Sequence, residues 1–126
     1  MPDAVHAEYL DAVGTPVVTE LACSLQGRQI EVELCEGSLL RRLYGAPRTR
    51  ERTTCSFGLA VGLEPITSAA GMRVAAVDDT GEVRAVERID HPFFVGTLYQ
   101  PQLSSTPAAP HPVLAGLVDA LGTALP

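Results

Sequence analysis

Two β-rich segments separated by a tight turn constrain the fold more than any other feature of this sequence. Segments 72–77 and 82–89 are rich in Val and Ala, and an Asp-Asp-Thr-Gly sequence at 78–81 separates them. Asp and Gly accept the backbone conformations that tight turns require, so the pattern predicts an antiparallel β-hairpin. A single hairpin is marginal in water, so further strands or a helix must cover one of its faces.

Other segments show either a two-residue periodicity or a continuous apolar run. Residues 29–34 alternate polar and apolar side chains, which predicts a half-buried strand. The β-rich segment 16–21 is expected to pair with it antiparallel across the turn at 26–27. Residues 53–59 are predicted to form a short strand. Segment 93–99 is the most continuously apolar part of the chain and predicts a buried central strand.

Three segments have the features of short helices. Residues 3–12 place apolar side chains at helical spacing after a capping aspartate, and residues 39–44 follow Ser38, a favourable N-cap. Residues 113–121 carry Val and Leu along one side and predict a closing helix. The charged run at 48–52 is interpreted as a solvated turn.

Length and charge exclude several classes of protein. The chain has 126 residues, which predicts one domain. Its formal net charge of −6 argues against a nucleic-acid-binding module, because such modules neutralise phosphates with basic side chains. Apolar runs fall short of the roughly 20 residues that span a bilayer. The N-terminus has no secretory signal pattern, so we expect a cytoplasmic protein that does not bind membranes.

Cysteine and histidine residues do not show a metal-ligand spacing. The three cysteines are odd in number and widely spaced, which favours reduced thiols over a disulfide framework. The three histidines are equally scattered. We therefore expect neither a metal site nor a cofactor. These residues are Cys23, Cys35, Cys55, His6, His91 and His111.

The C-terminal part of the chain carries a family resemblance. Segment 91–102 reads HPFFVGTLYQPQ, and Ser-Thr-Pro at 105–107 and His-Pro at 111–112 follow it. This block resembles the end of the class I glutamine amidotransferase domain of CTP synthase. Upstream landmarks occur in the same order, including Leu-Tyr-Gly at 43–45 and Glu-Arg at 51–52. The chain is also similar to small stand-alone proteins related to the C-terminal region of CTP synthase.

The resemblance implies the fold and the extent of the domain. We expect an α/β chain that forms the C-terminal half of a class I glutamine amidotransferase-like, flavodoxin-like domain, with a mixed sheet, β-hairpins and a closing C-terminal helix. Residues 1–126 then form a single partial domain.

The resemblance also implies which residues occupy the positions of the family's catalytic triad of Cys, His and Glu. The histidine position holds Gln100 and the glutamate position holds Gln102. A glutamine amide forms hydrogen bonds but does not exchange protons near pH 7. The nucleophile elbow lies in the half of the domain that this sequence does not match. The resemblance therefore implies a degenerate triad without glutaminase activity.

Several residues near the family's glutamine pocket are candidates for a different site. Cys55 is interpreted either as a reactive thiol whose thiolate Arg52 favours, or as a small buried residue. A small polar ligand is expected to bind through hydrogen bonds at the end of the apolar strand. The candidate pocket residues are Tyr99, Gln100, Gln102, Glu51 and Arg52. The histidines at 91 and 111 each precede a proline, which favours structural roles, with His111 capping the closing helix or facing the loop.

Three functional hypotheses remain open from the sequence. The first is a non-catalytic, amidotransferase-like protein that binds a small molecule or a partner. The second is an enzyme with relocated chemistry at Cys55, and the third is a truncated inactive copy of a longer protein. Because half of the domain is unmatched, uncovered surfaces are expected to bind a second copy or a separately encoded N-terminal half.

Overall fold

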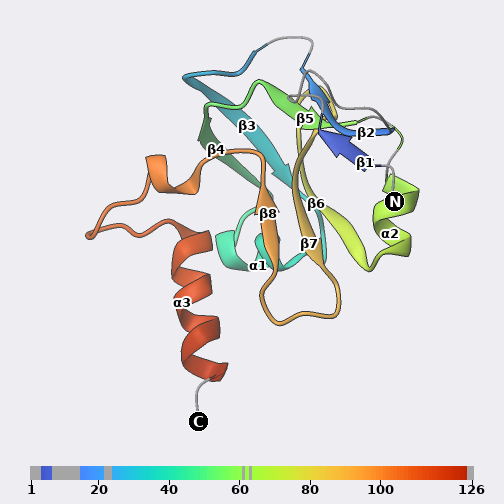
Figure 1. The fold of residues 1–126 in the computed structure, drawn as a ribbon. Coiled ribbons are helices and arrows are strands. Elements are labelled where there is room, and N and C mark those ends of the chain that lie inside the picture. Colours follow the sequence, from blue (N-terminus) through green and yellow to red (C-terminus); the bar gives the residue numbers. More distant parts are fainter. Residues whose placement is uncertain (1–3, 7–14, 22–23, 61, 63, 125–126) are drawn as a thin grey trace.

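The strands of the computed structural model form two sheets (Figure 1), and the model describes residues 4–6, 15–21, 24–60, 62 and 64–124. The larger sheet is antiparallel, with strand order β4-β3-β6-β7-β8, and the smaller sheet has the order β1-β2-β5. The elements are β1 Ala4–His6, β2 Thr15–Glu20, β3 Arg28–Leu34, α1 Leu39–Tyr44, β4 Arg48–Thr53, β5 Phe57–Leu59, α2 Glu64–Ala69, β6 Met72–Asp78, β7 Val83–Arg88, β8 Val95–Thr97, the 3₁₀ helix η1 Pro101–Leu103 and α3 Pro112–Ala124. The α/β class, the hairpin at 78–81 and the closing helix are confirmed.

Strand β3 lies near the middle of the larger sheet, between β4 and β6. Its predicted alternation is confirmed, because Val32 and Leu34 are buried while Glu31 and Glu33 are exposed. Side chains on a strand alternate between the two faces, so this pattern directs every second residue into the core.

The interpretation of 48–52 as a turn is wrong, because these residues lie in β4 at the edge of the larger sheet. Arg48 and Arg50 are exposed and pair across the strands with Glu33 and Glu31, at 3.7 and 3.0 Å. Glu51, which points to the other face, is buried. The arginines of the charged run therefore form the solvent face of an edge strand, a common way of protecting a sheet edge.

The expected pairing of 16–21 with 29–34 is also wrong. Strand β2 pairs with β1 in parallel and with β5 antiparallel, so it belongs to the smaller sheet. The helix predicted for 3–12 is wrong at Ala4–His6, because these residues form β1. Residues 3 and 7–12 lie outside the described residues. Backbone pairing along β2 outweighs the weak local preference for a helix.

The predicted strand at 93–99 is shorter and less buried than expected. Strand β8 comprises Val95–Thr97 at the edge of the larger sheet, and the Phe94 side chain is 47 % exposed. Strand β5 is likewise only the second half of the strand predicted within 53–59. Continuous apolar character does not distinguish a central strand from an edge strand that packs against a loop.

Two contacts cap the start of α1, and the second of them joins it to the larger sheet. The Ser38 hydroxyl accepts a hydrogen bond from the backbone N–H of Arg41 at 3.0 Å, which confirms the predicted N-cap. The carboxylate of Glu87 on β7 accepts the N–H groups of Leu39 and Leu40 at 2.9 and 3.3 Å. Both contacts satisfy N–H groups that lack partners at the start of a helix.

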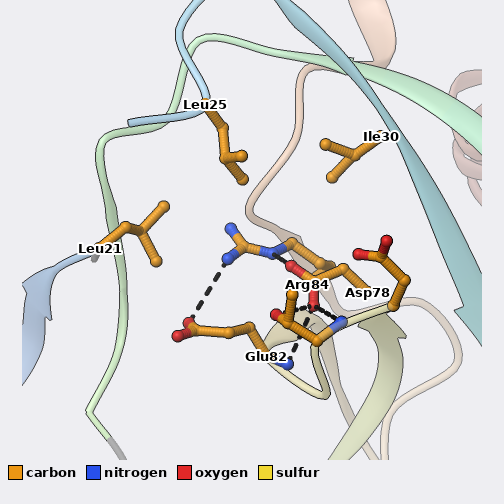
Figure 2. A pocket seen from close by; sticks show the side chains of 8 residues that line it. Leu21, Leu25, Ile30, Asp78, Glu82 and Arg84 are labelled. Carbon is orange, nitrogen blue, oxygen red and sulfur yellow. Dashed lines mark hydrogen bonds and ion pairs between the residues drawn. The ribbon is translucent and has the colours of Figure 1, made fainter. Parts of the chain in front are cut away.

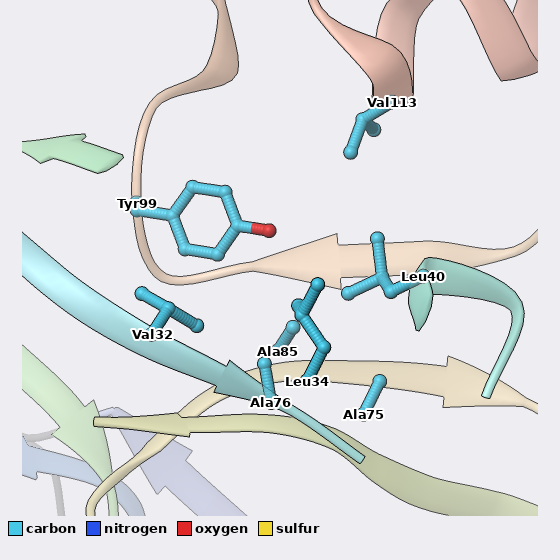
Figure 3. Packing of buried hydrophobic residues seen from close by; sticks show 8 residues of the cluster. All are labelled: Val32, Leu34, Leu40, Ala75, Ala76, Ala85, Tyr99 and Val113. Carbon is cyan, nitrogen blue, oxygen red and sulfur yellow. The ribbon is translucent and has the colours of Figure 1, made fainter. Parts of the chain in front are cut away.

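The main core lies between the larger sheet, α1 and the first turn of α3 (Figure 3). Gly116 lets α3 approach α1 closely, because a Cβ atom there would lie 2.6 Å from a methyl group of Leu43. Within the described residues, no helix combines the length and apolarity required to cross a membrane. The core residues are Val32, Leu34, Leu40, Ala75, Ala76, Ala85, Tyr99 and Val113.

Candidate functional site

Gln100 lies just after β8 and contacts the segment that joins β4 to β5. Its backbone N–H donates to the carbonyl oxygen of Arg52 at 3.0 Å. Its side-chain oxygen accepts from the N–H of Thr54 at 2.6 Å, and its side-chain nitrogen lies 3.4 Å from the Cys55 sulfur. Both ends of the amide are therefore held by one short segment, which fixes the orientation of the side chain.

Gln102 and Arg52 have a different environment from Gln100. Both side chains are exposed, Gln102 in the turn of η1 and Arg52 at the end of β4. Arg52 borders a depression of about 400 Å³ together with Thr53 and Leu103. The structure thus brings Gln100 and Cys55 into contact and places Gln102 and Arg52 at the solvent surface.

Glu51 and Tyr99 belong to a buried polar cluster with Tyr44 and His111. Glu51 is 2 % exposed, and its Oε1 atom lies 2.5 Å from the Tyr44 hydroxyl and 2.8 Å from His111 Nε2. The Tyr44 hydroxyl is also 3.1 Å from the Tyr99 hydroxyl and 3.1 Å from His111 Nε2. We name these four residues the buried tyrosine cluster. It joins α1, β4, the strand end at β8 and the start of α3.

The hydrogen-bond pattern assigns the protons of the cluster. The backbone N–H of Val113 donates to His111 Nδ1 at 3.1 Å, so this nitrogen carries no proton and Nε2 is the donor to Glu51. Burial raises the pKa of Tyr44 far above its ordinary value, and Tyr99 and Glu51 raise it further. Tyr44 therefore keeps its proton and donates it to Glu51.

His111 performs the predicted capping role at α3, because its ring accepts an N–H of the first helical turn. Both ring nitrogens are engaged, one by the helix and one by Glu51. An imidazole in this arrangement is not a free base for a reaction. Tyr44 was not predicted as a site residue, because it lies 67 positions from His111 and no local pattern links them.

The thiols and histidines that the structure describes outside the buried tyrosine cluster lie apart from one another. Within the parts of the chain that the structure describes, no group of three His, Cys, Asp or Glu side chains is placed to hold a metal ion. Cys35 is half-buried, and burial raises the pKa of its thiol, as do Glu33 and Glu87. His91 is exposed and accepts the N–H of Phe93 through Nδ1 at 3.1 Å. Cys23 lies outside the described residues.

Comparison with known proteins relates the chain to one family. No family model matches it. It is 30 % identical over 102 residues to CTP synthase from Phenylobacterium zucineum, a match that covers 80 % of this chain and 19 % of that protein. The chain thus spans about a fifth of the length of this curated relative.

Solved structures share the fold. The glutaminase domain of Trypanosoma brucei CTPS, solved with bound acivicin, superposes with a TM-score of 0.85 at 23 % identity, over 96 % of this chain and 52 % of that one. A putative GMP synthase protein from Thermoplasma acidophilum gives a TM-score of 0.62 at 12 % identity, over 85 % of this chain and 49 % of that one. Sequence similarity and shared fold together identify the chain as a relative of the class I glutamine amidotransferase domain of CTP synthase, about half of which it spans.

Proposed function

We propose that this chain is an amidotransferase-like binding module without glutaminase activity. The observation that carries the proposal is the set of hydrogen bonds that Gln100 makes, since by the sequence resemblance we expect this residue in the place of the catalytic histidine. Its amide is held at both ends by Thr54 and Cys55. It therefore acts as a structural link between the end of β8 and the segment that follows β4.

The chemistry of glutamine hydrolysis supports the same conclusion. The family mechanism needs a thiol nucleophile and a base that titrates near neutral pH, which a carboxylate orients. Neither Gln100 nor Gln102 titrates. Both ring nitrogens of His111 are engaged, one by the N–H of Val113 and the other by Glu51. Among the described residues no histidine therefore contacts Cys55 in the role of a base.

Glutamine hydrolysis provides the direct test. We expect the purified chain to release no more glutamate from glutamine than its Cys55→Ala variant does, because a base that exchanges protons is missing. A coupled glutamate assay with both proteins measures this. Release that exceeds the Cys55→Ala background, and that saturates with glutamine, would contradict the proposal.

The interaction surface of the proposed module is one face of α3. Leu114, Leu117, Val118 and Leu121 recur at helical spacing, and Val118 and Leu121 are 67 % and 57 % exposed. A groove of about 280 Å³ runs beside them, between α3 and the loop that contains Pro92. An apolar row at this spacing is the usual seam of a helix that packs against another element.

A second copy of the chain fits this face better than a charged partner does. Val118 protrudes beside a groove lined by Leu117 and Leu121, so each copy offers both a projecting side chain and a recess. Such a pairing is self-complementary about a twofold axis. The helix carries one charged residue, Asp119, so that two copies would bring few like charges together.

The oligomeric state tests this part of the proposal. We expect Val118→Asp to weaken self-association at least about tenfold, because it places a charge in the centre of an apolar interface. Ala108→Asp, which adds the same charge to an exposed loop, serves as the matched control and is expected to leave association unchanged. Light scattering over a concentration series measures the mass. A chain that stays monomeric at every concentration would contradict the proposed pairing.

A further inference from the structure

A pocket of about 290 Å³ lies between the hairpin of β6 and β7 and the segment that follows β2 (Figure 2). Its apolar side is formed by Leu21, Leu25 and Ile30. Its polar side is formed by Asp78, Glu82 and Arg84, which the hairpin carries. The three aliphatic side chains face the guanidinium group across the pocket in Figure 2.

Arg84 is the unusual member of the pocket, because its side chain is only 1 % exposed. Its Nε donates to Asp78 at 2.9 Å, and its Nη2 lies 3.5 Å from the Glu82 carboxylate. Its Nη1 is buried and has no hydrogen-bond partner among the described residues. A buried donor without a partner is rare in native proteins, so this nitrogen requires an explanation.

The guanidinium group is held in place from behind by Asp78. One oxygen of this carboxylate accepts from the N–H and the hydroxyl of Thr80, at 2.9 and 2.6 Å, and from the N–H of Glu82 at 3.1 Å. The other oxygen accepts from Arg84. Burial alone would raise the pKa of Asp78, but the hydrogen bonds from Thr80 and Arg84 outweigh it and lower the pKa. Asp78 thus remains ionised. Because it binds Arg84 through Nε, it makes no hydrogen bond with Nη1.

The apolar wall is attached to the rest of the molecule at defined points. The N–H of Leu21 donates to the carbonyl of Ser56 at 2.9 Å, and the N–H of Leu25 donates to that of Cys55 at 3.0 Å. A Cβ atom at Gly58 would lie 2.8 Å from a Leu21 methyl group, so glycine lets β5 lie close to the wall without displacing this side chain. The pocket is therefore bounded by secondary structure and by a backbone that hydrogen bonds restrain.

The charge balance determines the class of ligand. One arginine faces three carboxylates, those of Asp78, Asp79 and Glu82, so the polar side has an excess of negative charge. An anion would be repelled there, because the positive charge of Arg84 is already paired with Asp78 and the other two carboxylates remain. The free Nη1 therefore suits an uncharged acceptor such as a carbonyl oxygen.

We propose that this pocket binds a small uncharged carboxamide with a branched aliphatic group. The carbonyl oxygen accepts from Arg84 Nη1, and the aliphatic group lies among Leu21, Leu25 and Ile30. The amide nitrogen faces Glu82, whose carboxylate accepts hydrogen bonds. This site uses none of the residues in the Gln100 contact or the buried tyrosine cluster, so it stands independently of the proposed lack of glutaminase activity.

Isovaleramide is the probe, and isovalerate, which has the same carbon skeleton with a negative charge, is its matched control. We expect saturable ¹H–¹⁵N shifts of the Arg84 side chain with isovaleramide, at a Kd of about a millimolar for so small a molecule. Isovalerate is expected to bind at least about tenfold more weakly. Absence of saturable shifts, or equal binding of the two probes, would overturn the proposal.

A variant that fills the pocket tests the location without breaking the Arg84 ion pairs. Leu25→Trp is expected to weaken isovaleramide binding at least about tenfold, because the indole occupies the aliphatic half of the site. Leu103→Trp introduces the same side chain at an exposed position elsewhere and is expected to leave binding unchanged. Urea denaturation of both variants verifies that they are folded. Undiminished binding by folded Leu25→Trp would overturn the assignment.

Discussion

Replacing Asp78 with alanine is expected to lower the free energy of unfolding by about 3–5 kcal/mol at pH 7, the cost of leaving a buried charge unpaired. Arg84 is 1 % exposed and depends on Asp78 for its closest ion pair, at 2.9 Å. The substitution also removes the acceptor of two backbone N–H groups in the hairpin turn, those of Thr80 and Glu82. Because domains of this size are stable by only about 5–15 kcal/mol, such a loss is a large fraction of the total.

The matched control is Asp79→Ala, which removes the neighbouring carboxylate. Asp79 is exposed, and we expect its loss to change the free energy of unfolding by less than about 0.5 kcal/mol. Urea denaturation of the two variants and the unmodified chain provides the comparison. Equal effects of the two substitutions would show that the Asp78–Arg84 contact does not stabilise the fold.

The effect of Asp78→Ala also depends on pH. The pKa of Asp78 is lowered in the folded chain, so its contribution to the free energy of unfolding is complete above the ordinary aspartate pKa of about 3.9. It is lost as the pH falls through the lower pKa of the folded state. The difference between the unmodified chain and Asp78→Ala should therefore shrink between about pH 5 and about pH 2. A difference that stays constant would contradict this interpretation.

Replacing His111 with alanine is the second substitution with a large expected effect, about 3 kcal/mol. This value combines about 1 kcal/mol for the helix cap with about 1.5–3 kcal/mol for a hydrogen bond to a charged group. The ring accepts from Val113 at the start of α3 and donates to buried Glu51 at 2.8 Å. Without the ring, Glu51 loses one of its donors while it remains buried.

The variant His111→Asn separates the two contributions. An asparagine accepts the N–H of Val113 as a cap but is too short to reproduce the imidazole contact with Glu51, so a loss of about 2 kcal/mol is expected. Urea denaturation measures both variants. A loss below about 1 kcal/mol for His111→Ala would contradict the assignment, since the cap alone accounts for that amount.

The buried tyrosine cluster also connects stability with the candidate site. Glu51 precedes the segment that holds the Gln100 side chain, and Tyr99 is the neighbour of Gln100 in the chain. Tyr44 and His111 therefore position both strand ends at which Gln100 meets Cys55. The buried hydrogen bonds of Tyr99 and Glu51 with residues far away in the sequence therefore position the segments that meet at Gln100.

Local patterns predicted those elements whose neighbours in space are also neighbours in sequence. The Asp-Asp-Thr-Gly turn predicted the hairpin of β6 and β7, and Ser38 predicted the start of α1. These features depend on backbone conformation and capping within a few residues. The charged segment of β4 and the N-terminal strand β1 were predicted wrongly, because pairing with distant strands determines both.

The sequence by itself determined the hairpin and the caps at Ser38 and His111. Through the resemblance it also predicted the α/β class and the expectation that Gln100 and Gln102 occupy two positions of a triad. Only the tertiary structure decided the division into two sheets, the burial of Glu51 beside His111 and the buried Arg84 nitrogen that has no hydrogen-bond partner among the described residues. The physical reason is that periodicity reports which face of an element is apolar, whereas the partner of a buried charge is set by packing between distant segments.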